Sequence, residues 1–126
     1  MSPEYARHQL GRTAEQLAEQ FLQERGFQTI TRNLRTPFGE IDLICRRQRL
    51  LVFVEVRCRS QAAFMHPVES LTYAKLQRFR RSAQFYLRQH GRSQPYSAMR
   101  FDAICVTGKA NPTVEHFEDI VAVAEF

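Results

Sequence analysis

The hydrophobic positions of this chain repeat at two different spacings, which separate the predicted helices from the predicted strands. Apolar residues recur every three or four positions over 3–25 and again over 68–89, so we expect an amphipathic helix in each segment. Ser2 is placed to cap the first helix, and Gly26 and Gly91 follow the predicted C-terminal ends. One helix is therefore expected in each half of the chain.

Alternating and β-branched segments predict strands between these helices and after the second helix. Polar or Gly-containing and Pro-containing stretches separate these segments, as expected for turns. The predicted strands are residues 27–36, 39–46, 50–58 and 100–107, with a further strand within 113–121. The order αβββαβ, with or without the last strand, predicts a single α/β domain over 1–126 in which helices cover the faces of a central mixed sheet.

Composition and charge narrow the classes of function. The 126 residues, 44% of them hydrophobic and 25% charged, are typical of one soluble globular domain. The chain has no apolar run long enough to span a membrane and no signal-like N-terminus, so a cytoplasmic protein is expected. The net charge of +5 favours a polyanionic partner such as nucleic acid, although a basic surface does not require a partner.

The cysteines and histidines do not predict a zinc site. Cys45, Cys58 and Cys105 lie in predicted strands without a C-x-x-C pair, so we expect buried free thiols. The four histidines, His116 among them, are scattered without ligand spacing and are expected on the surface or in loops. The sequence also lacks a Gly-rich phosphate loop and a G-x-S-x-G motif, which leaves nucleotide hydrolysis and acyl transfer without support.

The segment FGEIDLICRRQRLLVFVEVRC places acids inside a predicted β-hairpin, where burial of a lone carboxylate is costly. If the turn centres on Gln48 and Arg49, then Asp42 lies opposite Glu55. The same register places Glu40 opposite Arg57. Alternation puts these side chains on one face, and it predicts an apolar opposite face that contains Ile41, Leu43, Cys45, Val52, Val54 and Val56.

Two facing carboxylates repel each other unless a positive group lies between them. One interpretation is structural: Arg57 and Arg59 neutralise the acids in a surface network. The other is a divalent cation, since Mg²⁺ prefers oxygen ligands and usually takes one or two protein carboxylates. Asp42, Glu55 and the backbone carbonyl of Val56 suit such a site. The residues alone leave both interpretations open.

Several motifs resemble a known family. GEIDLI followed by FVEVR resembles the D…E-x-K core of nucleases with the restriction-endonuclease-like fold, the PD-(D/E)xK superfamily. More closely, GRTAEQLAEQFLQERGF, GEIDLI, FVEVRCR and RFDAICV resemble the YraN-like family of uncharacterised bacterial proteins, which is similar to archaeal Holliday-junction resolvases. The resemblance implies a three-layer sandwich with an αβββαβ core and a central mixed sheet flanked by helices.

The resemblance also implies roles for individual residues. Asp42 and Glu55 match the metal-binding carboxylates, and Glu15 matches an acid on the first helix that completes the site in the resolvase relatives. Arg57 occupies the position of the motif lysine, and an arginine stays protonated and cannot act as a base. Lys75, in the apolar stripe of the second helix, either extends its ammonium to water or replaces the missing lysine.

The leading hypothesis is therefore a nucleic-acid-binding endonuclease that hydrolyses phosphodiester bonds with Mg²⁺ or Mn²⁺. DNA is favoured over RNA, with structured or branched DNA as one substrate class. The sequence does not decide whether the protein forms a homodimer. The basic residues expected to bind phosphates are Arg46, Arg47, Arg59, Arg78 and Arg81. The alternatives are a nucleic-acid-binding module of the same fold with impaired catalysis, and a protein-interaction adaptor whose carboxylates balance arginines.

Overall fold

The computed structural model describes residues 13–59 and 72–121. Each of the two described helices follows a threonine N-cap. The elements, in chain order, are α2 (Ala14–Glu24), β1 (Gln28–Thr36), β2 (Gly39–Arg47), β3 (Leu50–Arg59), α3 (Tyr73–His90), β4 (Ala98–Thr107) and β5 (Thr113–Phe117).

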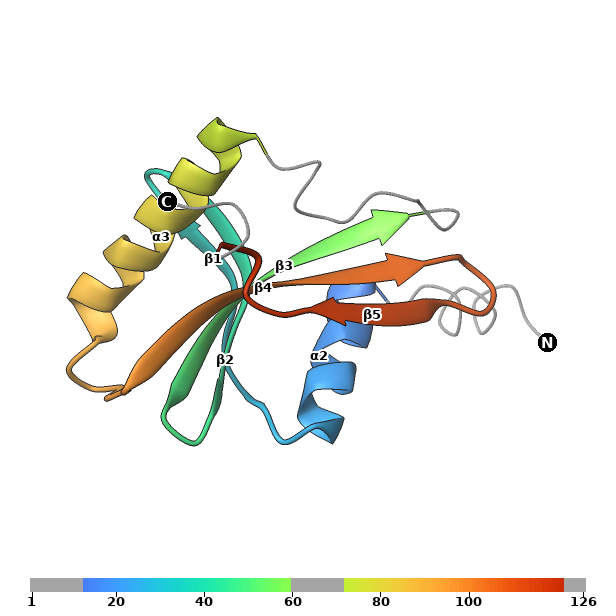
Figure 1. Ribbon diagram of the computed structural model, residues 1–126, viewed down its shortest axis with the longest axis horizontal. Coiled ribbons are helices and arrows are strands. Elements are labelled where there is room, and N and C mark those ends of the chain that lie inside the picture. Colours follow the sequence, from blue (N-terminus) through green and yellow to red (C-terminus); the bar gives the residue numbers. More distant parts are fainter. Residues whose placement is uncertain (1–12, 60–71, 122–126) are drawn as a thin grey trace.

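The five strands form one mixed sheet in the order β1-β2-β3-β4-β5. Strands β3 and β4 are parallel, because the chain crosses over through α3 between them, and the other neighbouring pairs are antiparallel. Figure 1 shows α2 and α3 on opposite faces of this sheet. The three-layer αβββαβ arrangement expected from the sequence is confirmed, and β5 adds a final strand.

Each face of the sheet has its own apolar core. Under α3, the aromatic side chains of Phe53, Phe79 and Phe101 pack with other buried residues from the helix and the strands. Under α2, Leu22 packs against Val52 and other aliphatic residues of the central strands. The central strands are therefore apolar on both faces, as expected for strands covered by helices on each side.

Both helices begin later than the apolar stripes predict. Thr13 and Thr72 have extended backbone conformations, and the hydroxyl of each accepts a hydrogen bond from a backbone N–H in the first helical turn. The prediction of one continuous helix over 3–25 is therefore wrong at Thr13, and the start of the second helix at Val68 is wrong as well. A threonine satisfies the free N–H groups at a helix start, which sets the boundary more sharply than periodicity does. The positions before Thr13, including Ser2, lie outside the described residues.

A buried polar network ties β4 to β5 and to the segment after β5. The fully buried carboxylate of Asp102 accepts two hydrogen bonds from Arg100, at 2.8 Å each, and one from the backbone N–H of Asp119 at 2.9 Å. Nε2 of His116 lies 2.7 Å from the same carboxylate. The expectation that His116 is a surface or loop residue is therefore wrong, because β5 brings its ring over the sheet between Phe21 and Phe27.

The cysteines divide into two buried thiols and one exposed thiol. Cys45 and Cys105 are buried, as expected, but Cys58 is exposed, so the prediction for Cys58 is wrong. Burial raises the pKa of the Cys45 thiol to about 12, which keeps it protonated and unreactive.

Loss of the Asp102 carboxylate should destabilise the fold strongly. Burial raises the pKa of Asp102, but the hydrogen bonds from His116 and Arg100 outweigh burial and lower the pKa below its ordinary value. We expect Asp102→Asn to reduce the free energy of unfolding at pH 7 by about 3 kcal/mol, because it leaves Arg100 without its buried partner. Urea denaturation measures this change.

The pH dependence and a matched variant check the cause. A carboxylate with a lowered pKa stabilises the fold above its unfolded pKa, and this contribution is lost as the pH falls below about 4. The difference between the wild type and Asp102→Asn should therefore shrink in acid. Glu118→Gln removes an exposed carboxylate 3.6 Å from Arg100 and should change stability by less than about 1 kcal/mol. Equal stability of the Asp102→Asn and Glu118→Gln proteins would contradict the prediction.

Candidate functional site: an acidic fork between two strands

The β2–β3 hairpin has the register that the sequence predicts. Leu43 pairs with Val54, and Arg47 pairs with Leu50, so the turn contains Gln48 and Arg49. Gln48 has a positive φ of 55°, the left-handed conformation that a tight turn without glycine requires. The hairpin therefore presents its acids at the end farthest from the turn.

The backbone ladder between β2 and β3 stops just before these acids. Its last recorded pair is Leu43 with Val54, so the expected direct pairing of Asp42 with Glu55 is not part of the ladder. Instead, Oδ2 of Asp42 accepts a hydrogen bond from the backbone N–H of Val56 at 2.8 Å. The side chain of Asp42 thus bonds to β3 where the two backbones no longer pair. We call this place the fork.

The loss of pairing at the fork changes which face some residues occupy. Ile41 packs in the core under α3 together with Ile44 and Phe53, so the prediction that Ile41 shares a face with Leu43 is wrong. Glu40 is exposed, and its expected pairing with Arg57 is wrong too. Strict alternation fails here because β2 no longer follows the straight ladder that the register assumes.

Asp42 has the most perturbed carboxyl group of the fork. Burial raises its pKa to about 6, against a lowering by the hydrogen bond from Val56, and the charges of Glu15, Glu55 and Glu40 raise it further. Glu15 lies in the first turn of α2, and its charge is one of those that raise the pKa of Asp42. The charges of three carboxylates therefore raise the pKa of the Asp42 carboxyl group.

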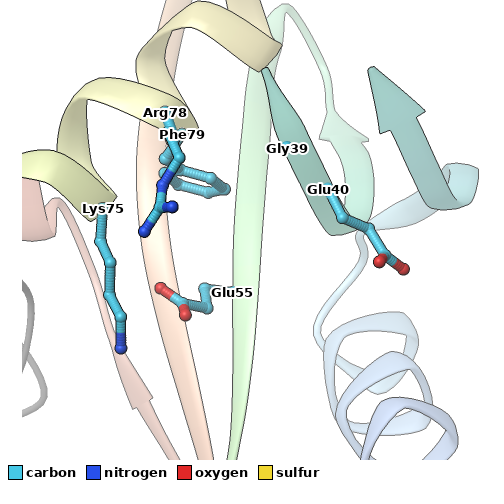
Figure 2. A pocket seen from close by; sticks show the side chains of 6 residues that line it. All are labelled: Gly39, Glu40, Glu55, Lys75, Arg78 and Phe79. Atoms are coloured by element: carbon cyan, nitrogen blue, oxygen red, sulfur yellow. The ribbon is translucent and has the colours of Figure 1, made fainter. Parts of the chain in front are cut away.

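Glu55 belongs to a pocket on the α3 side of the fork. Its Oε1 lies 3.7 Å from Nη1 of Arg57, so these neighbours on β3 form an ion pair. Figure 2 shows Lys75 and Arg78 extending from α3 toward Glu55, whereas the carboxylate of Glu40 points away from it. Lys75 is exposed and not buried in the apolar stripe, which agrees with an ammonium that reaches water beside an acid.

The other predicted phosphate-binding arginines lie in several places. Arg78 and Arg81 are exposed on α3. Arg46 and Arg47 lie at the turn end of the hairpin, where Arg46 bonds to the carbonyl of Pro95 and Arg47 covers the ring of Phe27. Arg59 is half-buried at the end of β3. Of these five arginines, Arg78 is the one that lines the pocket with Glu55, and Arg46 and Arg47 lie at the far end of the strands.

The carboxyl groups of the fork suit a hard cation, although they do not form a closed ligand cage. Within residues 13–59 and 72–121, no three His, Cys, Asp or Glu side chains are grouped closely enough to hold a metal. Oxygen donors from one or two carboxylates suffice for Mg²⁺, which completes its shell with water and substrate. Asp42 and Glu55 offer these donors, and three acids around Asp42 favour a positive charge there.

Residues 14–106 match the uncharacterised protein family UPF0102. The chain belongs to this family. It is the YraN-like family that the motifs indicated. A UPF0102 protein of Syntrophotalea carbinolica is 40% identical over 116 residues, covering 90% of this chain and 91% of the relative. A UPF0102 protein of Anaeromyxobacter dehalogenans is 45% identical, covering 88% of this chain and 82% of the relative.

A search of solved structures found SfsA of Pyrococcus furiosus in complex with Ca²⁺, with 14% sequence identity and a TM-score of 0.40. The match covers 88% of this UPF0102 chain and 63% of the SfsA chain. Within the described residues of the UPF0102 protein, neither helix is long and apolar enough to cross a membrane.

Two features near the site of this UPF0102 protein were not predicted from the sequence. Ser82 is fully buried on α3, and its hydroxyl lies 2.8 Å from Oγ1 of Thr36, next to the β1–β2 turn. Oγ1 of Thr36 also accepts hydrogen bonds from the backbone N–H groups of Phe38 and Gly39. The sequence signal for this buried contact was a serine among the apolar residues of the helical stripe. This contact fixes the start of β2 against the helix that carries Lys75.

Neutralisation of Asp42 should stabilise the metal-free protein. A carboxyl group with a raised pKa favours the fold while it is protonated, and this stability is lost as the pH rises from about 4 through about 6. Asp42→Asn keeps an acceptor for the Val56 N–H and removes the charge. We expect its free energy of unfolding at pH 8 to exceed that of the wild type by about 1 kcal/mol, since partial exposure screens the effect.

The check is chemical denaturation in the presence of a chelator at pH 8 and at pH 4.5, where the gain should largely disappear. Asp42→Ala serves as the matched control, because it also removes the charge but leaves the N–H of Val56 without its acceptor. This variant should be about 1 kcal/mol less stable than Asp42→Asn. A destabilised Asp42→Asn protein would instead support a structural network of acids and arginines.

Proposed function

We propose that this protein is a nucleic-acid-binding endonuclease that hydrolyses phosphodiester bonds with Mg²⁺ or Mn²⁺. The observation that carries the proposal is the fork, where Asp42 is held by the N–H of Val56 among the carboxylates of Glu15, Glu40 and Glu55. Asp42 and Glu55 would hold the ion, and Glu15 would contribute from α2. DNA, including branched DNA, is the favoured substrate class.

A bound divalent cation would supply an activated water and offset the charge that develops on the phosphate. The protein supplies position and charge. The Val56 N–H fixes the orientation of the Asp42 carboxylate. Burial raises the pKa of this carboxyl group to about 6. Since a metal ligand must be deprotonated, metal affinity should fall as the pH drops below about 6.

The motif lysine of the superfamily has two candidate replacements. Arg57 lies on the correct strand, but a guanidinium does not act as a base, and its Nη1 lies 3.7 Å from Oε1 of Glu55. Lys75 lines the same pocket as Glu55 and approaches it from α3 (Figure 2). An ammonium can give up a proton when its surroundings change, which a guanidinium cannot do. Lys75 is therefore the better candidate for a residue that acts on the reacting phosphate.

The remaining basic residues would bind phosphates without reading sequence. Arg78 lines the pocket beside Glu55, so it suits the strand next to the scissile bond, and Arg81 is exposed further along α3. Arg46, Arg47 and Arg59 would contact more distant phosphates. Since Arg46 and Arg47 already contact Pro95 and Phe27, we expect their contribution to be smaller than that of the α3 pair.

A specific observation also favours a non-catalytic nucleic-acid-binding module. Arg57 replaces the lysine of the motif, and its ion pair with Glu55 partly neutralises an acid that the metal would need. In that case the basic surface would still bind nucleic acid, and the loss of affinity with added salt would persist. The protein-interaction adaptor predicts neither metal binding nor this salt dependence.

The direct test is a panel of flap, junction, single-stranded and duplex substrates with Mg²⁺ or Mn²⁺. We expect Asp42→Asn and Glu55→Gln each to lower the cleavage rate at least about 100-fold, because each removes a charge that holds the ion. Glu24→Gln is the matched control, since Glu24 is an exposed acid at the end of α2, and its activity should equal that of the wild type. Cleavage that survives both site substitutions would refute the proposed site, and the absence of cleavage with retained binding would favour the non-catalytic module.

The two candidate basic residues can be compared in the same assay. We expect Lys75→Ala to lower activity at least as much as Arg57→Ala does, because the lysine, and not the paired arginine, is free to act on the phosphate. Arg57→Lys should preserve or raise activity, since lysine restores the motif. Circular dichroism confirms the fold of each variant. Full activity in folded Lys75→Ala protein would show that Lys75 only extends its ammonium to water.

A further inference from the structure

The pocket beside Glu55 is a defined cavity between the sheet and α3. Its volume is about 270 Å³, and it is lined by Gly39, Glu40, Glu55, Lys75, Arg78 and Phe79. Its cationic side chains, Lys75 and Arg78, lie one helical turn apart on the same face of α3, so both heads enter the cavity (Figure 2). We call this cavity the α3 pocket.

The α3 pocket is closed at the end formed by the β1–β2 turn. A Cβ atom on Gly39 would lie 3.5 Å from the hydroxyl of Ser82 and 3.7 Å from Cβ of Arg78, so strand and helix are already in contact there. The Thr36–Ser82 hydrogen bond, at 2.8 Å and within this buried contact, joins the two elements. The ring of Phe79, which is only 8% exposed, forms an apolar wall. A nucleic-acid strand that enters the pocket cannot continue between β2 and α3.

The charges of the α3 pocket favour a doubly charged anion. The acid that enters the pocket, Glu55, is already paired with Arg57. The carboxylate of Glu40 points away from the cationic heads (Figure 2). Among the described residues, neither Lys75 nor Arg78 lies within ion-pair distance of an acid, so the cavity holds two cationic heads beside the single carboxylate of Glu55. A terminal phosphate carries a charge of about −1.5 to −2 at pH 7, whereas an internal phosphodiester carries a single charge.

We propose that the α3 pocket binds the terminal phosphate of a nucleic-acid strand, so that the enzyme acts on strands near their phosphorylated ends. This inference rests on the proposed function and specifies its substrate class. The closed end explains why the bound group is terminal. The volume of about 270 Å³ is sufficient for a phosphate group.

Binding of dinucleotides tests the proposal without any cleavage. Thymidine dinucleotides with a 5′-phosphate, with a 3′-phosphate or with neither are titrated into the full-length protein with a chelator present, and NMR shifts or calorimetry give the Kd. We expect one phosphorylated form to bind at least about tenfold more tightly than the form without a terminal phosphate. Equal affinity of all three dinucleotides would overturn the proposal.

Variants on α3 assign the binding to this pocket. Lys75→Gln and Arg78→Gln keep most of the side-chain stem and remove the charge, and each should abolish most of the preference for a terminal phosphate. Arg88→Gln is the control, because Arg88 is exposed in the last turn of the same helix, and its preference should equal that of the wild type. An unchanged preference in both pocket variants would place the phosphate elsewhere and refute the assignment.

The outcome separates this inference from the proposed function. Dinucleotide binding does not need the metal, so a protein without nuclease activity can still show the preference. Conversely, an active nuclease that binds all three dinucleotides equally would refute only the terminal-phosphate pocket. Turnover of substrates with and without terminal phosphates then distinguishes the roles of Lys75: loss of binding energy affects the phosphorylated end alone, whereas loss of a catalytic group slows the cleavage of both substrates.

Discussion

The hydrogen bond from the Val56 N–H to the Asp42 carboxylate is the interaction on which the candidate site depends. At this point a side-chain oxygen accepts a bond from β3 just beyond the last recorded pair of the β2–β3 ladder. The N–H of Val56 is therefore satisfied although the strands no longer pair, which avoids the cost of a buried donor without a partner. Because the acceptor is a carboxylate, the same contact holds a negative charge where Glu15 and Glu55 also act on it.

The two helices cover opposite faces of the sheet, and they bring side chains of opposite charge to the region of the fork. Helix α2 carries Glu15 near Asp42, and α3 carries Lys75 and Arg78 near Glu55. The apolar cores on both faces fix these distances, and the Thr36–Ser82 bond fixes the start of β2 against α3. The polar groups thus depend on tight packing, since a helix that moved by a fraction of a turn would separate its charges from the strands.

Sequence patterns predict most of the fold because hydrophobic periodicity reflects burial directly. The hairpin register, the sheet class and the buried face of α3 follow from spacing alone. Three features do not follow from it. Helix starts depend on the conformation of Thr13 and Thr72, and the face of Ile41 depends on where the ladder ends. The Asp102–His116 contact joins residues from two strands, so neither residue alone shows that the other is its partner.

The two motif acids differ in how their charges are balanced, and this difference bears on the arginine in the motif. Arg57 lies beside Glu55 and compensates it, whereas the described residues that act on Asp42 through their charge are carboxylates. Replacement of the motif lysine by arginine therefore leaves the need for a positive charge at Asp42 unchanged. A lysine at position 57 would have a shorter and more mobile head group, which could leave Glu55 for the phosphate. The present pair is a loose one, because Nη1 of Arg57 lies 3.7 Å from Oε1 of Glu55 and has no hydrogen-bond partner among the described residues. If the proposed nuclease function holds, the cations on the opposite wall of the pocket, on α3, would be a second source of positive charge beside Glu55.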